Sequence, residues 1–199
     1  MSNSIYENDN HYKLRSLVRE FAEQEIAPVA RELDEKEEFS APLVKTMGDL
    51  GLLGINLPEK YGGEGKDTLS YIIAVEELAR VDGSQAATIA AHNSLGVYPI
   101  YQWGTEDQKE KFLPQLTTGE KLWAFGLTEE NAGSDARGTE TEATLKNGEW
   151  VINGKKRYIT NGSVDINAGI TLQVITGLEN GHKELSTILV ERSREGFSS

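Results

Sequence analysis

The residues of this chain best suited to ligand chemistry follow an apolar run, residues 123–127, that has the composition of a buried strand. Residues 128–135 then turn small and polar, and they carry the hydroxyls of Thr128 and Ser134. Gly133 allows the backbone to approach a ligand closely, and successive backbone N–H groups in such a turn form a concavity that binds anions. The stretch therefore predicts a strand that leads into an anion-binding loop.

A second polar patch, residues 153–162, lies farther along the chain. Its Asn153-Gly154 pair is a strong signal for a tight turn. Tyr158 and Thr160 stand two positions apart, which places an aromatic ring and a hydroxyl on the same face of a strand. A flat ring with hydroxyl donors, beside a loop that accepts phosphate, would suit a flavin.

The composition bounds what else the chain can do. With 199 residues, 38% hydrophobic and 26% charged, it has an ordinary globular composition and a length that fits one large domain or two small ones. Its net charge of -12 argues against non-specific binding to nucleic acid or to an anionic membrane. An anionic ligand must therefore be held by local N–H groups and a few well-placed cations.

The residue types that are missing exclude several further functions. The chain has no cysteine, which rules out disulfides, thiolate metal sites and a cysteine nucleophile. Residues 1–10 are polar and lack both the basic start and the apolar core of a signal peptide. No stretch approaches the roughly 20 apolar residues that cross a bilayer. We therefore expect a cytoplasmic protein with no metal, no nucleic-acid partner and no membrane partner.

The elements that must position these residues fall into two groups. Up to about residue 120, apolar side chains recur at three- and four-residue spacing, which predicts helices. We expect these helices at residues 12–35, 42–51, 68–79, 85–100 and 105–119. Pro28 should break or kink the first helix unless a new turn starts there. Ser84 and Thr105 are the expected N-caps of the last two helices, and Gln108 completes a capping box with Thr105.

From residue 123 onward the pattern changes to short alternating runs. Beyond the first strand, further strands are expected at residues 139–145, 150–152, 157–160, 170–175 and 186–190. Asn-Gly pairs separate several of them, which is typical of antiparallel hairpins. We therefore expect an α+β protein, in which an all-helical domain of residues 1–121 is followed by an antiparallel β-domain of residues 122–199.

One polar pair, His92 and Asn93, interrupts the small and apolar helix expected at residues 85–100. Two interpretations stay open. In the first, the pair is hydrogen-bonded or exposed for structural reasons alone. In the second, this turn of the helix borders a substrate cavity.

The two polar stretches resemble the flavin-binding segments of the acyl-CoA dehydrogenases. The likeness is carried by Phe125-Gly-Leu-Thr-Glu-Glu-Asn-Ala-Gly-Ser-Asp135 and by Asn153-Gly-Lys-Lys-Arg-Tyr-Ile-Thr-Asn161. Further stretches that resemble the family are residues 93–96, 104–109, 112–114, 185–190 and 196–197. The likeness runs in order over essentially the whole chain, and several motifs in register are far more specific than any one alone.

This resemblance implies a helical N-terminal domain, a middle β-domain and a C-terminal four-helix bundle, with FAD held between the β-domain and the bundle. The bundle has no counterpart in this sequence. Carried over by position, the residues that would bind the cofactor are Phe125, Gly126, Leu127, Thr128, Gly133, Ser134, Tyr158, Ile159 and Thr160.

Individual roles follow from the same resemblance. Leu127 and Thr128 would contact the pyrimidine edge of the flavin, and Ser134 would face a phosphate of FAD or the CoA part of the substrate. Tyr158 would pack on the flavin ring, and Thr160 would hydrogen-bond near the flavin N5. The family often has tryptophan at the position of Tyr158, so the ring contact would be smaller here, although tyrosine still offers a π-face.

The family's reaction is the α,β-dehydrogenation of an acyl-CoA thioester. A carboxylate base removes the α-proton while the β-hydrogen leaves as hydride to the flavin N5, and that base is a glutamate of the C-terminal bundle. No matching position exists in this chain. Glu129, Glu130 and Asp135 suit structural roles better than that of a base, and His92 is no better a candidate. We therefore expect a fragment of a longer enzyme, which binds FAD weakly if at all and turns over no acyl-CoA.

Other functions stay open beside the dehydrogenase. One is a non-catalytic relative kept for binding or assembly, and another is a flavin used differently, as in acyl-CoA oxidases and monooxygenase relatives. The resemblance also implies an acyl-CoA substrate with Ala91 and His92 near the floor of its pocket. It further implies electron-transfer flavoprotein as the acceptor and a homo-oligomer for the full-length enzyme.

Overall fold

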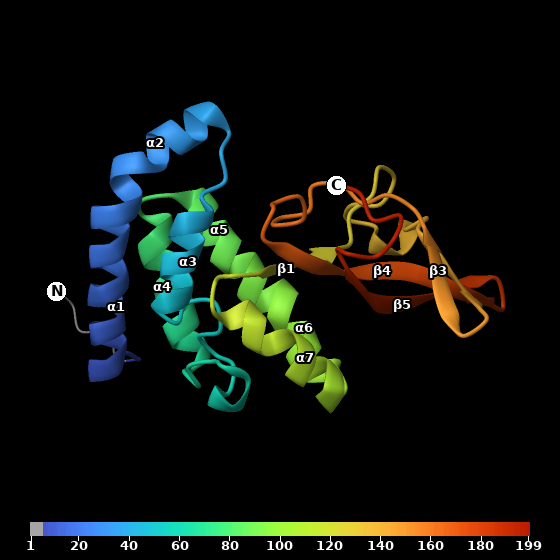
Figure 1. Cartoon of the computed structure of the whole chain (residues 1–199), viewed down its shortest axis with the longest axis horizontal. Coiled ribbons are helices and arrows are strands. Elements are labelled where there is room, and N and C mark those ends of the chain that lie inside the picture. Colours follow the sequence, from blue (N-terminus) through green and yellow to red (C-terminus); the bar gives the residue numbers. More distant parts are fainter. Residues whose placement is uncertain (1–5) are drawn as a thin grey trace. The chain divides into compact units, whose positions relative to one another are not determined.

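The computed structural model describes residues 6–199, which divide into two compact units. One ends at Leu122 and consists mainly of helices, and we call it the helical unit. The other begins at Trp123, holds most of the strands, and is called the sheet unit (Figure 1). Within residues 6–199, no helix is both long and apolar enough to span a bilayer.

The first helix bends where the sequence places Pro28. Its parts are α1 (Asp9–Phe21), a π-helical turn (Ala22–Ile26) and α2 (Ala27–Lys36). Proline has no N–H to donate to the carbonyl four residues back. Just before it, the hydrogen bonds span five residues instead of four, and the N–H of Ala27 donates to the carbonyl oxygen of Ala22. A new turn therefore starts at Pro28, and α2 leaves the line of α1 (Figure 1).

Further helices complete the described part of the helical unit. They are α3 (Ala41–Asp49), a 3₁₀ turn (Glu59–Tyr61), α4 (Thr68–Ala79), α5 (Gly83–Ala91), a π-helical stretch (His92–Val97), α6 (Tyr98–Trp103) and α7 (Glu106–Thr117). The capping box of Thr105 and Gln108 opens α7. The N-cap of α5 is Asp82 rather than Ser84, because the Asp82 carboxylate accepts the N–H and the hydroxyl of Ser84, each at 2.7 Å.

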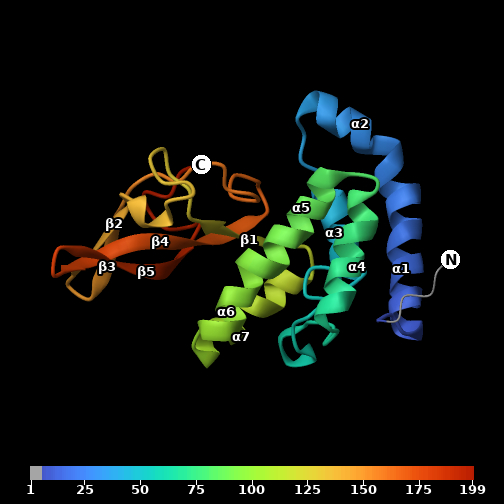
Figure 2. The ribbon, with the colours of Figure 1, turned by 180° about the vertical axis from the view of Figure 1, so that it is seen from behind.

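The core of the helical unit gathers the apolar faces of these helices and the run that follows α3. Leu52, Leu53 and Leu57 of that run have no exposed surface. Helix α4 packs against both α1 and α5 (Figure 2). This packing brings charged side chains of α1 up against α4.

A buried carboxylate ties α1 to α4. Glu77 is fully buried, and its oxygens accept bonds from Arg15 at 2.6 Å and from Arg19 at 2.8 Å. Arg80, at the C-terminal end of α4, adds a bond at 3.1 Å. Burial by itself would raise the pKa of Glu77, but the guanidinium groups of Arg19 and Arg15 outweigh it and lower that pKa to about 2. The carboxylate is therefore ionised at neutral pH and holds the two helices together.

The sheet unit is built on one long strand, β4 (Asn167–Glu179). The other strands are β1 (Leu122–Gly126), β2 (Glu142–Lys146), β3 (Glu149–Asn153) and β5 (His182–Glu191). β4 pairs with β1, β2 and β5, and β2 pairs with β3. The β2–β3 and β4–β5 hairpins are antiparallel, as the sequence predicts.

One pairing makes the sheet mixed rather than purely antiparallel. β2 and β4 run parallel, with Glu142 opposite Ile175. The loop of residues 154–166 carries the chain back after β3, so that β4 starts in the direction of β2. A period-two pattern cannot show this, because it is the same for parallel and antiparallel neighbours.

Both hairpins turn at Asn-Gly pairs. Asn147 and Gly148 have φ angles of 51° and 85°, and Asn180 and Gly181 have φ angles of 50° and 80°. Positive φ at both positions is typical of the two-residue turn that matches the twist of the flanking strands. These turns confirm two of the turn signals in the sequence.

The loop between β3 and β4 corrects two predictions. The Asn153-Gly154 pair forms no tight turn, because neither residue has a positive φ and β3 runs on to Asn153. A Cβ on Gly154 would lie 2.3 Å from the Thr141 hydroxyl oxygen, so this glycine serves close packing. The strand expected at residues 157–160 is also wrong, because Tyr158 has a φ of 56° and the segment is a loop.

Candidate functional site

The sheet unit brings the two polar stretches together. One is the loop of residues 127–135 that leaves β1, and the other is the loop of residues 154–162 that follows β3. We call them the binding loops. The backbone N–H of Arg157 donates to the carbonyl oxygen of Thr128 at 2.8 Å, and the ammonium of Lys156 donates to that of Leu127 at 3.2 Å. These bonds hold the two loops side by side.

A buried ion pair also joins the binding loops. The Lys156 ammonium lies 2.6 Å from the Glu129 carboxylate, and the two side chains are only 6% and 5% exposed. The hydroxyls of Thr139 and Thr141 donate to the same carboxylate. The backbone N–H groups of Glu140 and Thr141 do so as well, at 2.6 and 3.1 Å. A buried charge is stable only when it is paired and hydrogen-bonded in this way.

The acidic side chains of the first binding loop are engaged in structure. Burial alone would raise the pKa of Glu129, but the ammonium and hydroxyl groups around it hold that pKa far below its ordinary value. Glu130 is exposed and pairs with Arg157 at 3.3 Å. Asp135 accepts the N–H of Arg137 at 3.2 Å and so caps a 3₁₀ turn. These contacts give each of the three acidic side chains a structural role.

The binding loops carry hydroxyls that bond to no protein atom within the described residues. They belong to Thr128, which is half-buried, and to Ser134 and Thr160, which are exposed. The backbone N–H groups of Gly133 and Ser134 likewise meet no protein acceptor in residues 6–199. A Cβ on Gly133 would meet no heavy atom within 4 Å, so the fold itself does not require glycine there. The loops therefore present hydrogen-bond donors that the fold does not use.

Tyr158 projects from the second binding loop in an unusual backbone conformation. The residue is 90% exposed, and its φ of 56° lies in the left-handed region. Bulky residues rarely adopt positive φ, and such strain persists only where the surroundings impose it. Here the preceding Lys156 and Arg157 are bonded to the first loop. The ring is accessible to a ligand, although not through the strand alternation expected from the sequence.

The remaining residues of the predicted site are less open. Those that are half-buried are Phe125, Leu127 and Ile159 in the sheet unit and Ala91 in the helical unit. Gly126 is buried in β1, where a Cβ would lie 2.5 Å from a Leu172 methyl group. Side-chain ends therefore fill the space beside Gly126, and the contact of this glycine with a cofactor stays a prediction.

His92 and Asn93 both lie buried in the helical unit, where the second π-helical stretch begins. The His92 Nε2 lies 2.8 Å from the carbonyl oxygen of Leu116. The Asn93 amide donates to the carbonyl oxygens of Leu52 and Ile89 at 2.8 and 2.9 Å. These bonds favour the structural interpretation of the pair, and the contact of this turn with a substrate stays a prediction.

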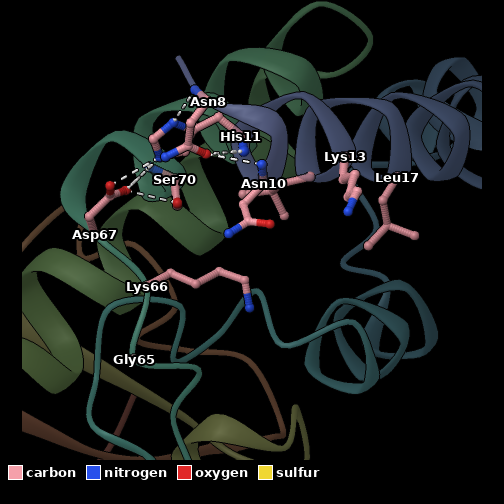
Figure 3. A pocket seen from close by; sticks show the side chains of 10 residues that line it. Asn8, Asn10, His11, Lys13, Leu17, Gly65, Lys66, Asp67 and Ser70 are labelled. Atoms are coloured by element: carbon pink, nitrogen blue, oxygen red, sulfur yellow. Dashed lines mark hydrogen bonds and ion pairs between the residues drawn. The ribbon is translucent and has the colours of Figure 1, made fainter. Parts of the chain in front are cut away.

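The helical unit also holds a pocket that the sequence did not indicate (Figure 3). It has a volume of about 470 Å³ and lies between the start of α1 and residues 65–70. The buried His11 accepts the N–H of Asn8 at Nδ1, so its Nε2–H donates to Asp67 at 3.0 Å. The N–H and hydroxyl of Ser70, together with His11, hold the pKa of Asp67 below its ordinary value. These polar groups of the pocket wall are therefore engaged with one another.

The described chain thus combines a helical unit with a small mixed sheet from which two polar loops converge. Residues 8–120 match the model of the acyl-CoA dehydrogenase N-terminal domain, and residues 124–199 match that of the acyl-CoA dehydrogenase middle domain. The chain therefore belongs to the acyl-CoA dehydrogenase family.

Individual relatives agree with this. The chain is 46% identical over 185 residues to the short-chain specific acyl-CoA dehydrogenase of Clostridium acetobutylicum, covering 93% of this chain and 48% of the relative. It superposes on a chain in the structure of the electron transferring flavoprotein of Acidaminococcus fermentans with a TM-score of 0.90 and 37% identity, covering 97% of this chain and 50% of that one. For the acyl-CoA dehydrogenase of Bacillus anthracis complexed with FAD, the TM-score is 0.87 at 37% identity, covering 96% and 32%. The chain spans about half the length of the curated relatives it matches.

Sequence reasoning missed the part played by Lys156. Within Lys155-Lys156-Arg157 it has the appearance of ordinary surface charge. A usable signal was the acidic Glu129 in the other polar stretch, because a carboxylate that becomes buried needs a cation near it.

Proposed function

We propose that this chain forms the N-terminal and middle domains of an FAD-dependent acyl-CoA dehydrogenase, with residues 1–121 as the helical domain and residues 122–199 as the flavin-contacting domain. The reaction is the α,β-dehydrogenation of an acyl-CoA thioester. The observation that carries this proposal is the convergence of two binding loops whose hydroxyls the described chain leaves unused. Family membership and the FAD in the Bacillus anthracis relative support it.

The binding loops suit the two chemically distinct parts of FAD. The N–H groups of Gly133 and Ser134, with the Ser134 hydroxyl, are donors of the kind that hold a pyrophosphate. Thr128 and Thr160 offer hydroxyls to the polar edge of the flavin ring, and Tyr158 offers a face for stacking. When bound, FAD supplies the hydride acceptor of the reaction.

The substrate and the acceptor are proposed from the relatives. The Clostridium acetobutylicum relative is short-chain specific, which supports a short acyl chain as the substrate. The place of Ala91 and His92 near the acyl pocket rests on the resemblance in sequence alone. The likeness to a chain in the electron transferring flavoprotein structure supports that flavoprotein as the electron acceptor. A cytoplasmic location and a homo-oligomeric full-length enzyme complete the proposal.

The catalytic base is proposed to be none of the acidic residues of the binding loops. Glu129 is ionised and surrounded by donors, and Glu130 and Asp135 are engaged elsewhere. We therefore expect that anaerobic mixing of the FAD-equilibrated chain with a short-chain acyl-CoA leaves the flavin absorbance unchanged. Bleaching of the flavin would show that the chain carries a base of its own.

A methyl group on Gly133 tests the close approach of the ligand to the first binding loop. Because a Cβ there meets no protein atom within 4 Å, Gly133→Ala should leave the stability of the chain unchanged. The methyl would intrude on the space of the bound pyrophosphate, and FAD binding should weaken by about tenfold, or about 1.4 kcal/mol. Titration followed by flavin fluorescence measures this.

The control for Gly133→Ala is Gly83→Ala. Gly83 also has open space at its Cβ position and lies in the helical unit. This variant should bind FAD as the wild type does. Equal affinity of both variants and the wild type would argue against a phosphate site at Gly133.

A further inference from the structure

Lys156, which is not among the predicted cofactor residues, uses all of its hydrogen-bond donors within the protein. An ammonium group has three N–H donors. That of Lys156 bonds to the Glu129 carboxylate at 2.6 Å, the Thr139 hydroxyl at 3.0 Å and the Leu127 carbonyl oxygen at 3.2 Å. The side chain is 6% exposed. Its charge is therefore directed at the protein and not at a ligand.

A glycine in β1 leaves room for this lysine. A Cβ on Gly126 would lie 3.2 Å from the Lys156 Cγ and 2.8 Å from the terminal methyl of Ile170. The aliphatic stem of the lysine thus passes close to the backbone of β1 on its way to Leu127. The glycine of the first polar stretch and the lysine of the second are packed as one arrangement.

Lys156 and the residues that it bonds to are close in sequence to the residues that would contact a cofactor on each loop. Its bond to the carbonyl oxygen of Leu127 lies one position before Thr128, whose own carbonyl oxygen accepts the N–H of Arg157 at 2.8 Å. On the other loop, Tyr158 follows two positions after the lysine, with a φ of 56°. The ammonium of Lys156 and the N–H of Arg157 thus connect the loops next to Thr128 on one side and next to the turn of Tyr158 and Thr160 on the other.

We propose that Lys156, with its charge balanced by Glu129, is a positioning residue for the two binding loops. It touches no cofactor itself. It holds the hydroxyl of Thr128 and the turn of residues 158–160 at a fixed separation before a ligand arrives. The identity of that ligand, FAD, rests on the proposed function, whereas the positioning rests on the contacts of the chain itself.

The variant Lys156→Met removes the ammonium and keeps an unbranched stem. Glu129 retains its four other hydrogen bonds from Thr139, Glu140 and Thr141, which offset part of the cost of the unpaired carboxylate. The sheet unit should therefore lose stability but stay folded. Exchange of the hydrogen-bonded amides of Glu129 and Arg157, one in each binding loop, should become at least about tenfold faster, while exchange in β4 stays unchanged. Lys156→Arg should restore slow exchange. Lys155→Met, which removes an exposed neighbouring lysine, is the matched control and should change nothing.

A second readout separates positioning from stability. In a fluorescence titration of the same full chain with FAD, Lys156→Met should bind about tenfold more weakly than the wild type. Val174→Ala, which opens a cavity at a fully buried position of β4, should lower the thermal stability but leave the FAD affinity unchanged. A loss of affinity in both variants would mean that only stability matters, and would overturn the proposal.

The remaining outcomes are also decisive. Native exchange in the binding loops of Lys156→Met, or equal loosening by Lys155→Met, would overturn the proposal. If Lys156→Met unfolds the sheet unit, the double variant Glu129→Gln/Lys156→Met also removes the carboxylate charge that Lys156→Met leaves unpaired. Loosened loops in that folded variant support the proposal, and native exchange overturns it. Loosened loops together with an unchanged FAD affinity would support the positioning and contradict FAD as the ligand that the loops are positioned for.

Discussion

Replacing Glu77 with glutamine should lower the free energy of unfolding of the helical unit by about 3 kcal/mol at neutral pH. Glutamine keeps the shape of the side chain but not its charge, so Arg15, Arg19 and Arg80 lose a shared, fully buried partner. The side chains of these arginines are 21%, 42% and 46% exposed, and their partial rehydration keeps the loss near the lower end of the expected range. Urea denaturation of the whole chain, followed by helical circular dichroism, measures the loss.

The same carboxylate should make the stability depend on pH. The pKa of Glu77 falls from an ordinary 4.5 to about 2 in the folded chain. A lowered folded-state pKa contributes stability that is present above pH 4.5 and is lost as the pH falls toward 2. The wild type should therefore lose about 3 kcal/mol across this window that Glu77→Gln does not lose.

The control for Glu77→Gln is its neighbour Glu76→Gln. Glu76 bonds to Arg15 at 2.7 Å, but its side chain is 56% exposed. An exposed pair of this kind contributes about 0.5 kcal/mol or less. If the two variants lose the same stability, or if both follow the pH profile of the wild type, the buried cluster does not hold α1 to α4.

A methyl group on Gly169 should destabilise the sheet unit by about 3 kcal/mol. Its Cβ would lie 2.5 Å from the Trp123 ring and 2.5 Å from the carbonyl oxygen of Val190 on β5. Trp123 is fully buried and donates to the Thr171 hydroxyl at 3.0 Å, so the ring cannot yield without breaking that bond. Thermal unfolding of Gly169→Ala, followed by near-ultraviolet circular dichroism, measures the effect.

Gly177→Ala, in the same strand, provides the comparison. The three atoms nearest to its Cβ would all belong to the Glu184 side chain, and the closest is a carboxylate oxygen at 2.3 Å that can rotate away. This variant should cost under about 1 kcal/mol, as most substitutions away from the core do. Similar losses for both glycines would show that the contact of Gly169 with Trp123 is not what makes glycine necessary.

The helical unit was largely predictable because its signals are local. The sequence bounds of α4 are those of the structure, and the capping box at Thr105 is decided by residues three positions apart. The bend at Pro28 follows from the absence of a single N–H. The N-cap predicted for α5, Ser84, was wrong. Asp82 and Ser84 are both good capping residues, and the choice between them depends on which side chain reaches the free N–H groups.

The sheet unit was less predictable because its decisive contacts are distant in sequence. The Asn-Gly rule is right at Asn147 and wrong at Asn153, where the approach of Gly154 to Thr141 sets the backbone instead. The stretch that contains Tyr158 has the sequence pattern of a strand. In the structure it is a loop, next to the bonds that join Lys156 to the first binding loop. The types of the candidate site residues could be read from the sequence, but not the ion pair that joins their loops.

The most direct test of the flavin-site proposal is a titration of the isotope-labelled chain with FAD, followed by amide chemical shifts in NMR. Even weak binding moves the shifts of the groups that touch the ligand. The proposal predicts saturable shifts that are largest at Thr128, Gly133, Ser134 and Thr160. Shifts confined to other residues, or none in either binding loop at a large excess of FAD, would contradict a flavin site on this sheet.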